Sequence, residues 1–423
     1  MLIGNKTSTI HIIVLIVVFI FTTKFFQSTP FETLFFKVQA GFLGILLLFL
    51  VAYILSLIVN RKTINKTVFY FILLILFMPI YSAYRSNVEF GQPFFYGLAS
   101  QRGWLLLGAG IWFYYIIITK KVSMLTIERS FLVMSLASLI IFSFFYLTFD
   151  PSQLIGDESF ARMTEDRGLR LKFQNFFITF GALYYFIKYS IHRKLNDLLM
   201  LFSFLAFIVF IIQGRTYMIF LAGTFLLYYY FNFPISKFFL NIIKILLFLL
   251  TILVLINILM PEYLERMGKL FGDMFTVLGG EKSQDASANA RIWTSEIALD
   301  YFHSHPMSIW FGTGKVSNQW NGGYDTLFGY FYPADIGILG GTFLYGIFGI
   351  ILLVLIPLFL EIKEIKKAKD KNNVFIMTIR YMLILSIIKL IQDGLYFGAS
   401  IWIILFFILY GYNRLNKKGL NVT

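Results

Sequence analysis

Arginine residues stand on the polar stretches that separate or flank the long apolar runs of this chain. The arginine fork stays charged at physiological pH and donates paired hydrogen bonds to phosphate and carboxylate oxygens. The residues that could act in this way are Arg102, Arg162, Arg167, Arg170, Arg215 and Arg291. Each alone could equally extend its charge to lipid headgroups, but gathered on one side of a membrane they would form an anion-binding site.

Three further residues could accept a proton from a hydroxyl group and so activate it as a nucleophile. Asp335 is the first choice, because it stands at the start of an apolar run where a helix dipole favours negative charge, although helix capping explains it equally well. Asp325 and His305 come next. For His305 and the neighbouring His303, a place in an exposed loop is the simpler interpretation.

The composition fixes the class of protein. Hydrophobic residues make up 58% of the 423 residues and charged residues only 14%, which predicts an all-α polytopic membrane protein. The net charge of +14 is spread over short clusters between apolar runs, a pattern typical of membrane topology signals and not of nucleic-acid binding. There is no cysteine, only four histidines and no nucleotide-binding motif, so we expect neither a metal site nor a cofactor.

Apolar runs of about 17 to 25 residues, the length that spans a bilayer, predict about twelve transmembrane helices. They lie near residues 10–23, 38–59, 67–84, 99–118, 130–149, 173–187, 196–212, 215–232, 238–260, 335–360, 375–391 and 394–411. No small-residue cleavage site follows the first run, which we therefore interpret as a retained helix.

The positions of lysine and arginine predict how these helices are oriented. If the N-terminus is cytoplasmic, the inner connections carry more than twice as many basic residues as the short outer loops. We therefore expect both termini in the cytoplasm. The chain would then divide into transmembrane helices (1–260), an extracytoplasmic segment (261–334), and further helices with a cytoplasmic tail (335–423).

The extracytoplasmic segment is expected to contain two amphipathic helices. The first opens the segment and carries apolar residues at helical spacing, so it should lie flat on the membrane surface. The second runs from about residue 290 to residue 302, with an apolar ridge of Trp293, Ile297 and Tyr301. Arg291 would add its charge to the free N–H groups at the start of that helix, which favours anion binding there.

Four motifs in a fixed order carry a resemblance to a known family. They are ESFARMTEDRGLRLKFQNFF from Glu158, QGRTYMIFLAGTFLL from Gln213, an Arg-x-Trp helix followed by a His-Pro…Phe-Gly-x-Gly turn, and PADIGILGGTFLYGIFGII from Pro333. Together they resemble the bacterial polysaccharide polymerases of the Wzy type and the related O-antigen ligases, over roughly Glu158 to Ile350. The helix number, the orientation and the long outer segment are similar as well.

The resemblance implies a GT-C-like glycosyltransferase that works without a metal ion on the outer face of the bacterial cytoplasmic membrane. It would transfer a glycan from undecaprenyl diphosphate to the next lipid-linked repeat unit, and so build a capsule or lipopolysaccharide chain. Arg215 and Arg291 are implied to hold the pyrophosphate, with Arg162, Arg167 and Arg170 in the similar arginine-rich loop. Membrane lipids, a flippase and a chain-length regulator are the implied partners.

The sequence departs from the ligases at one place. They carry a functional His-Asn pair just before the tenth helix, where this chain offers Tyr324, Asp325 and Asp335 instead. Tyr324 is a candidate for substrate binding, since an aromatic ring can stack on a sugar. This difference favours a polymerase, with a ligase as the alternative. A second alternative is a non-enzymatic transporter or flippase, which would usually carry charges at mid-membrane and have two related halves, and this sequence has few such charges and no evident repeat.

Overall fold

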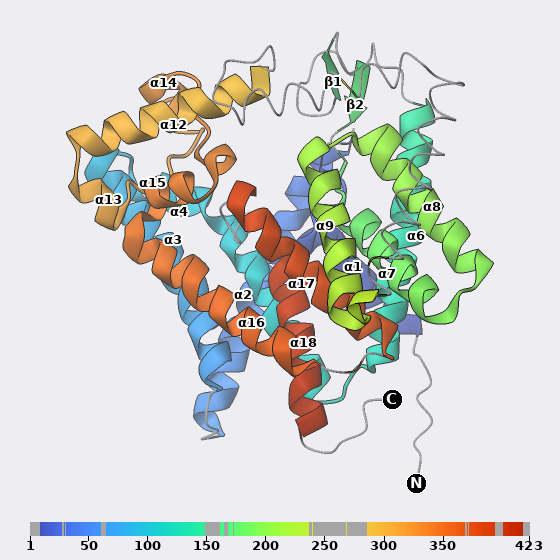
Figure 1. Ribbon diagram of the computed structural model, residues 1–423. Helices are drawn as coiled ribbons and strands as arrows, with labels where there is room; N and C mark the ends of the chain where they lie inside the picture. Colours follow the sequence, from blue (N-terminus) through green and yellow to red (C-terminus); the bar gives the residue numbers. More distant parts are fainter. Residues whose placement is uncertain are drawn as a thin grey trace. The chain divides into compact units, whose positions relative to one another are not determined.

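The computed structural model describes residues 9–27, 29, 31–60, 65–148, 161–164, 168–171, 173–236, 239, 268, 286–368, 370, 372–393 and 401–417. These residues are almost entirely α-helical, with one short strand pair (Figure 1). Long apolar helices make the chain an α-helical membrane protein. It divides into two compact units, and each is described by itself.

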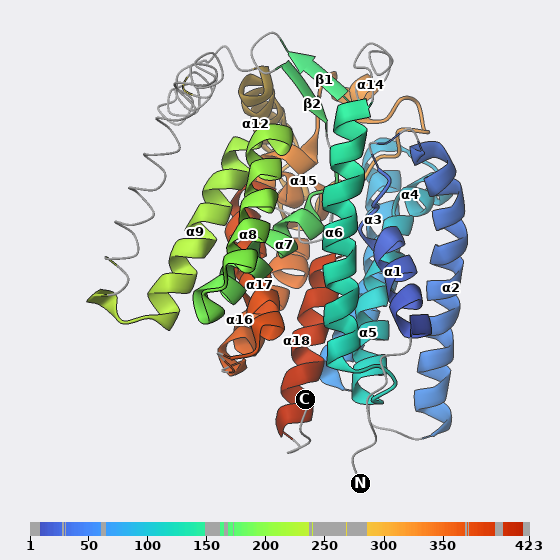
Figure 2. The ribbon, with the colours of Figure 1, turned by 90° about the vertical axis from the view of Figure 1, so that its right-hand side faces the viewer.

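The first unit comprises residues 1–134, 291–369 and 386–423. Its elements are α1 (Thr9–Thr22), α2 (Glu32–Val59), α3 (Lys66–Phe90), α4 (Phe94–Ser100), the 3-10 helix η1 (Arg102–Leu107), α5 (Gly108–Ile118), most of α12 (Ala286–Ser304), α13 (Met307–Phe311), α14 (Tyr324–Phe328), the 3-10 helix η4 (Pro333–Ile336), α15 (Gly337–Ile350), the π-helical turn η5 (Ile351–Leu355), α16 (Ile356–Lys367) and α18 (Ile401–Lys417). Helices α12, α13 and α14 lie at one end, whereas α18 ends at the opposite end (Figures 1 and 2).

The second unit comprises residues 135–290 and 370–385. It contains β1 (Ala161–Thr164), β2 (Gly168–Leu171), α7 (Phe176–His192), α8 (Leu195–Phe207), the π-helical turn η3 (Ile208–Ile212) and α9 (Arg215–Asn232). Helices α6 (Met124–Thr148) and α17 (Val374–Asp393) contribute residues to both units.

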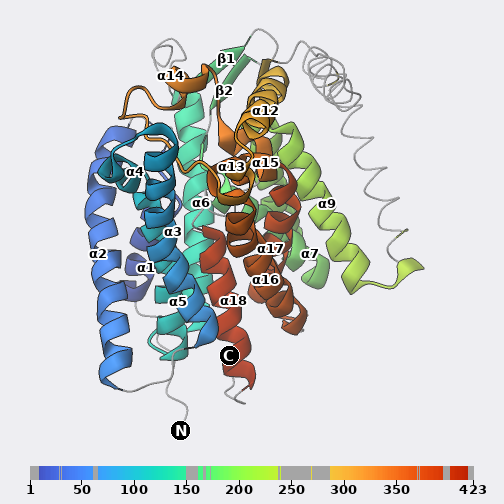
Figure 3. The same cartoon turned by 90° about the vertical axis from the view of Figure 1, so that its left-hand side faces the viewer.

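Glycines allow the helices of the first unit to approach closely. Helix α18 is buried on all sides from Ile401 to Tyr412, as expected for a helix that is apolar around its whole circumference. It packs along α5, where a side chain at Gly110 would meet the carbonyl oxygen of Ile403 at 3.0 Å. Helices α2, α3 and α5 run side by side in the same unit (Figures 2 and 3). Such small-residue contacts are the usual way in which helices pack in a bilayer, where the hydrophobic effect does not drive them together.

In the second unit, α7 packs between α8 and α9. The ring of Phe204 on α8 lies against Gly181, and the rings of Phe186 and Phe225 stack with centroids 4.1 Å apart. The strands β1 and β2 pair antiparallel, with Arg162 opposite Arg170 in the register. Apart from this strand pair, which was not predicted, the described residues agree with the expected all-α class.

Helix positions were well predicted by the apolar runs. Every predicted run overlaps a helix except 238–260, of which the structure describes only residue 239. Among the described residues, five helical stretches are both long and apolar enough to cross a bilayer: Glu32–Val59, Lys66–Phe90, Met124–Thr148, Leu195–Ile212 and Pro333–Lys367. The total of about twelve spans and the GT-C arrangement stay predictions.

Two predicted helices are interrupted. The run at 99–118 is divided among α4, η1 and α5, and the run at 335–360 bends at Gly346, whose φ of 70° and ψ of 176° are not helical. The regular helical hydrogen bonds of α15 are interrupted at this break. The carbonyl oxygens of Phe343 and Leu344 instead accept the N–H groups of Thr313 and Gly314, at 2.8 and 2.9 Å. A segment distant in sequence thus provides hydrogen-bond donors for the carbonyl groups that the break leaves without helical partners. Such groups need partners in a low-dielectric interior.

The same segment, residues 312–314, contacts two helices at backbone distance. A side chain at Gly312, whose φ is +69°, would lie 2.5 Å from the nitrogen of Gly346. A side chain at Gly314, whose φ is +79°, would collide with the backbone of Ser82 and Ser86 on α3. Glycine is needed at both positions because both the backbone conformation and the space exclude a Cβ atom.

We expect Gly312→Ala to lower the free energy of unfolding by about 3 kcal/mol, since it adds left-handed strain to a collision with backbone that cannot move aside. Thermal unfolding of the purified protein in detergent measures this effect. Gly44→Ala is the matched control: no atom lies within 4 Å of the added Cβ, so its midpoint should stay unchanged or rise. Equal midpoints for Gly312→Ala and the unmodified protein would contradict the close crossing.

Candidate functional site

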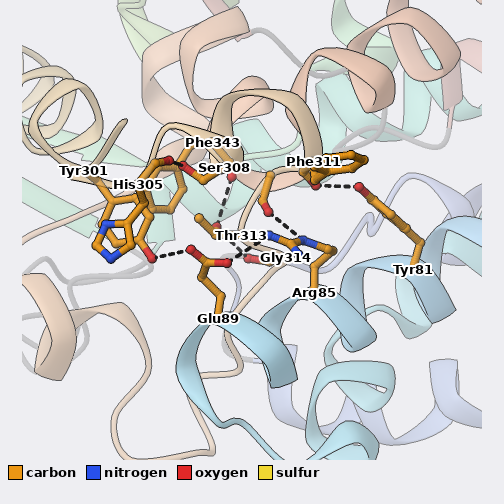
Figure 4. Close-up of polar contacts among 11 residues, drawn as sticks. Tyr81, Arg85, Glu89, Tyr301, His305, Ser308, Phe311, Thr313, Gly314 and Phe343 are labelled. Atoms are coloured by element: carbon orange, nitrogen blue, oxygen red, sulfur yellow. Dashed lines mark hydrogen bonds and ion pairs between the residues drawn. The ribbon is translucent and has the colours of Figure 1, made fainter. Parts of the chain in front are cut away.

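A polar cluster lies at the end of α3, where α12 and α13 meet it (Figure 4). Arg85 donates from Nε to the carbonyl oxygen of Gly312 at 2.9 Å and from Nη2 to Oε2 of Glu89 at 2.9 Å. The other carboxylate oxygen of Glu89 accepts the hydroxyl of Tyr301 at 2.8 Å. The imidazole of His305 stacks on the ring of Tyr301, with centroids 4.4 Å apart and planes at 14°. We call Arg85, Glu89, Tyr301 and His305 the α3–α12 cluster.

Local sequence explains how each side chain reaches this cluster. Arg85 and Glu89 are one helical turn apart, so both lie on one face of α3. Gly91, in the left-handed conformation, then ends α3 and leaves both residues in its last turns. Tyr301 and His305 have the same spacing: Tyr301 lies in the last turn of α12, and His305, the first residue after it, donates its N–H to the carbonyl oxygen of Tyr301 at 2.8 Å. Pro306 is the N-cap residue of α13.

The cluster is largely shielded from solvent. The side chains of Arg85 and Glu89 are only 15% and 13% exposed, so their ion pair is stronger than one on an open surface. Burial, and then the hydrogen bond to the carboxylate of Glu89, raise the pKa of the Tyr301 hydroxyl. Tyr301 therefore remains a hydrogen-bond donor, and it holds the carboxylate on the side opposite to Arg85.

His305 is the candidate base that the structure connects to other polar groups. Its side chain is exposed, and its carbonyl oxygen accepts from the hydroxyl of Ser308 at 2.6 Å, which fixes the turn after α12. His303 is also exposed but lies on another face of the helix, two residues earlier. The stack on Tyr301 therefore orients one of the two histidines and leaves the other in the surface position that the sequence suggested for both.

The two aspartates predicted as bases are exposed. Asp335 lies in η4, directly before α15, as the sequence predicted. The N-cap residues of η4 and α15 are Tyr332 and Ile336, and neither makes a capping hydrogen bond with its side chain. Asp335 therefore does not occupy a helix N-cap position. Asp325 lies in the first turn of α14 with an exposed side chain.

Tyr324, predicted to bind substrate, is buried. Its hydroxyl donates to the carbonyl oxygen of Gly314 at 2.8 Å and accepts the N–H of Val316 at 3.2 Å. Its ring packs against Phe331 and Phe343, and burial raises the pKa of its hydroxyl. Tyr324 thus anchors residues 314–316 inside the first unit.

Two of the predicted anion-binding arginines belong to the first unit, and both are exposed. Arg102 is the first residue of η1. Arg291 is the sixth residue of α12, which begins at Ala286 and not near residue 290. The prediction that Arg291 stands beside the free N–H groups of the helix start is therefore wrong, because those groups belong to the first turn.

The buried face of α12 also differs from the predicted one. Trp293 is 56% exposed, whereas Thr294 and Ala298 are almost fully buried one position further along the helix. Small side chains at these two positions let α12 approach the aromatic core, and a tryptophan there would hold it away. Tyr301 joins this face and so reaches Glu89.

The remaining predicted arginines belong to the second unit or lie outside the described residues. Arg162 and Arg170 are partners in the β1–β2 register, and Arg215 is the first residue of α9. Arg167, like the first predicted amphipathic helix of the outer segment, lies outside the described residues. A shared site of Arg162, Arg170 and Arg215 with Arg291 and Asp335 stays a prediction.

Sequence reasoning did not select Arg85 or Glu89, and Tyr301 was expected only as part of an apolar ridge. One signal was available: an arginine and a glutamate at i and i+4 near the end of an otherwise apolar helix. That spacing predicts an ion pair between the two residues, but it does not predict the tyrosine that donates a hydrogen bond to the second oxygen of the carboxylate.

Comparisons with known proteins add no assignment. No protein-family model matches the sequence, and no curated protein sequence matches it. In the described part of the chain no group of three or more histidine, aspartate or glutamate side chains is placed to hold a metal ion.

We expect Tyr301→Phe to lower the free energy of unfolding by about 2 kcal/mol, because it removes a hydrogen bond to a shielded carboxylate. Thermal or denaturant unfolding in detergent measures the change. Tyr330→Phe is the control, because Tyr330 is 54% exposed and loses an equivalent hydroxyl. If the two substitutions have equal effects, the hydroxyl of Tyr301 does not hold Glu89.

Proposed function

We propose that this protein is a glycosyltransferase that polymerises oligosaccharide repeat units carried on undecaprenyl diphosphate. The reaction would take place on the outer face of a bacterial cytoplasmic membrane, with both termini in the cytoplasm. The resemblance to Wzy-type polymerases suggests the substrates, and the α3–α12 cluster is the observation that supports a reaction centre. It joins a shielded ion pair to an oriented, solvent-accessible imidazole.

The cluster also lies at the appropriate end of its unit. Arg85 and Glu89 are in the last turns of α3, and the topology predicted from lysine and arginine positions makes that end of α3 extracytoplasmic. Arg102 opens η1 at the same predicted face. A lipid-linked diphosphate embedded in the outer leaflet would present its charged group at this depth.

The chemistry requires a base and a stabilised leaving group. In the proposed reaction His305 accepts the proton of an acceptor hydroxyl while that oxygen bonds to the anomeric carbon of the donor sugar. The bond from that carbon to the diphosphate oxygen breaks, and its electron pair leaves with the lipid diphosphate. Imidazole is the side chain most often used as a general base in enzymes. Tyr301, held by Glu89 and Arg85, is a positioning residue that orients the ring.

Arginines would stabilise the departing diphosphate. Negative charge grows on its oxygens as the bond breaks, and guanidinium groups already in place lower the energy of that state. Arg215 and Arg291 are the residues that the resemblance assigns to this role. Asp335 and Asp325 are exposed near the same segment and remain the alternative bases in this proposal.

A transporter is the less favoured alternative. Discontinuous helices in transporters use freed backbone carbonyls to coordinate ions. Helix α15 is interrupted at Gly346, but the carbonyl oxygens of Phe343 and Leu344 are already occupied by Thr313 and Gly314. An O-antigen ligase would share the donor and differ only in the acceptor, so phenotype must separate it from a polymerase.

Deletion of the gene tests the proposed function. We expect surface glycans reduced to single repeat units, because the donor would still be made and exported but not extended. Gel electrophoresis of the extracted glycan measures the chain length. Normal chain length would refute the proposal, and polymer that accumulates on the lipid carrier without reaching its acceptor would identify a ligase.

We expect His305→Gln to reduce polymer formation by about 100-fold to 10,000-fold, the usual contribution of a general base. His303→Gln is the matched control, since it removes an exposed histidine from the same helix end and should retain activity. Both proteins should be expressed at the normal level, measured by immunoblotting. Equal activity of the two variants would exclude His305 as the base and leave Asp335 and Asp325.

A further inference from the structure

A second polar group in the first unit is formed by three basic residues from three distant parts of the chain. Lys24 follows α1, Arg102 opens η1, and Lys315 follows the Gly312–Gly314 crossing. We call these residues the cation triad. Arg102 and Lys315 are exposed, and Lys24 is half-buried.

Buried polar side chains fix two members of the triad to one point on α3. The hydroxyl of Ser82 accepts the backbone N–H of Lys315 at 2.9 Å and the side-chain amide of Gln101, the residue before Arg102, at 2.7 Å. Ser82 and Gln101 are 0% and 3% exposed. Buried groups with matched partners position backbone precisely enough to hold a preformed site.

Gln92 holds the other side of the Lys315 backbone. Its amide nitrogen donates to the hydroxyl of Ser86 at 2.8 Å and to the carbonyl oxygen of Lys315 at 3.4 Å. Its amide oxygen accepts the N–H of Ser317 at 2.7 Å. Lys315 is therefore held by hydrogen bonds on both sides, and only its long side chain is free to move.

Lys24 occupies a backbone position that normally favours glycine. Its φ is +53°, and it stands at the left-handed position that closes α1. The N–H of Phe25 donates to the carbonyl oxygen of Ile20 at 3.0 Å and that of Lys24 to Phe21 at 3.4 Å, the two bonds of a Schellman motif. A lysine here costs conformational energy that glycine would not, which suggests a use for its charge.

The helix dipole gives an alternative reason for a cation at this position. Lys120 closes α5 in the same way, with φ of +55° and N–H groups of Lys120 and Lys121 bonded to Ile117 and Ile116 at 3.0 and 2.9 Å. Lys120 is on the opposite predicted face of the membrane and has no part in the triad. Lys120 therefore serves as a control for Lys24, because it has the same backbone conformation and hydrogen bonds but does not belong to the triad.

Lys24 interacts electrostatically with both other members of the triad. Partial burial lowers the pKa of Lys24; the charge of Glu32 opposes this change, and the weaker effect of Arg102 adds to it. Partial burial and the charge of Lys24 lower the pKa of Lys315. Among the described residues, three positive groups thus share one neighbourhood with the carboxylate of Glu32, so positive charge is in excess. A bound anion would relieve this repulsion.

We propose that Lys24, Arg102 and Lys315 together bind a phosphate-class anion at the predicted outer surface of the protein. The proposal rests on the convergence of three elements, the buried Ser82 and Gln92 scaffold, and a lysine kept at a glycine-like position. The phosphate could belong to a diphosphate-linked substrate or to a membrane phospholipid. The site does not depend on glycosyl transfer, so it can hold even if the α3–α12 cluster is not a reaction centre.

The test uses the full-length protein and two probes. Inorganic pyrophosphate is titrated calorimetrically into protein in phosphatidylcholine nanodiscs, and retention of phosphatidylglycerol by detergent-purified protein is measured by native mass spectrometry. We expect Lys24→Gly, Arg102→Gln and Lys315→Gln each to weaken binding of at least one probe by about fivefold, the usual contribution of one basic residue beside an anionic surface.

Lys24→Gly gives the sharpest contrast with its controls. Glycine suits the left-handed position, so its unfolding midpoint should equal or exceed that of the unmodified protein while anion binding falls. Lys120→Gly makes the same backbone change and Lys37→Gln removes an exposed charge from α2; neither should weaken binding. Loss of pyrophosphate binding alone would identify a diphosphate ligand, and loss of phosphatidylglycerol alone a lipid ligand. Equal binding by all variants, absence of binding to both probes, or an equal loss in the controls would refute the site.

Discussion

The polar end of the first unit depends on one backbone crossing, in which residues 312–314 pass between α3 and the interrupted helix α15. The crossing satisfies the carbonyl oxygens of Phe343 and Leu344, which the break at Gly346 would otherwise leave unpaired in an apolar interior. It also delivers the carbonyl oxygen of Gly312 to Arg85 and the backbone of Lys315 to Ser82. Both polar clusters are therefore anchored to the same short segment.

Charged groups near the end of a membrane helix are tolerated because each is compensated. Glu89 receives one hydrogen bond from Arg85 and another from Tyr301, so both of its oxygens have partners. Arg85 also donates to backbone, which joins α3 to the crossing. A rigid, paired arrangement of this kind can hold the imidazole of His305 in a defined orientation while leaving it accessible. The cation triad differs in that its basic side chains share one neighbouring carboxylate, that of Glu32, so positive charge is in excess there.

Much of the helical framework could be predicted, and the details of the cluster could not. Apolar runs located the helices, since hydrophobic length is read along the chain without reference to its neighbours. The break at Gly346 was missed because a glycine in an apolar run resembles many glycines that pack within straight helices. The face of α12 was misjudged by one residue, because large apolar side chains at Trp293 and Ile297 suggested burial, whereas close packing selected the small Thr294 and Ala298.

The sequence by itself determined that this is an α-helical membrane protein and where most of its helices lie, and it predicts which side of the membrane the basic residues favour. These properties follow from local composition and charge. Only the tertiary structure decided that His305 and not His303 stacks on Tyr301, and that Ser82 joins the backbone of Lys315 to Gln101, the residue before Arg102. Contacts between distant parts of the chain depend on how each helix is rotated about its axis and on how closely its small residues let it approach a neighbouring helix. The period of a single helix does not contain that information.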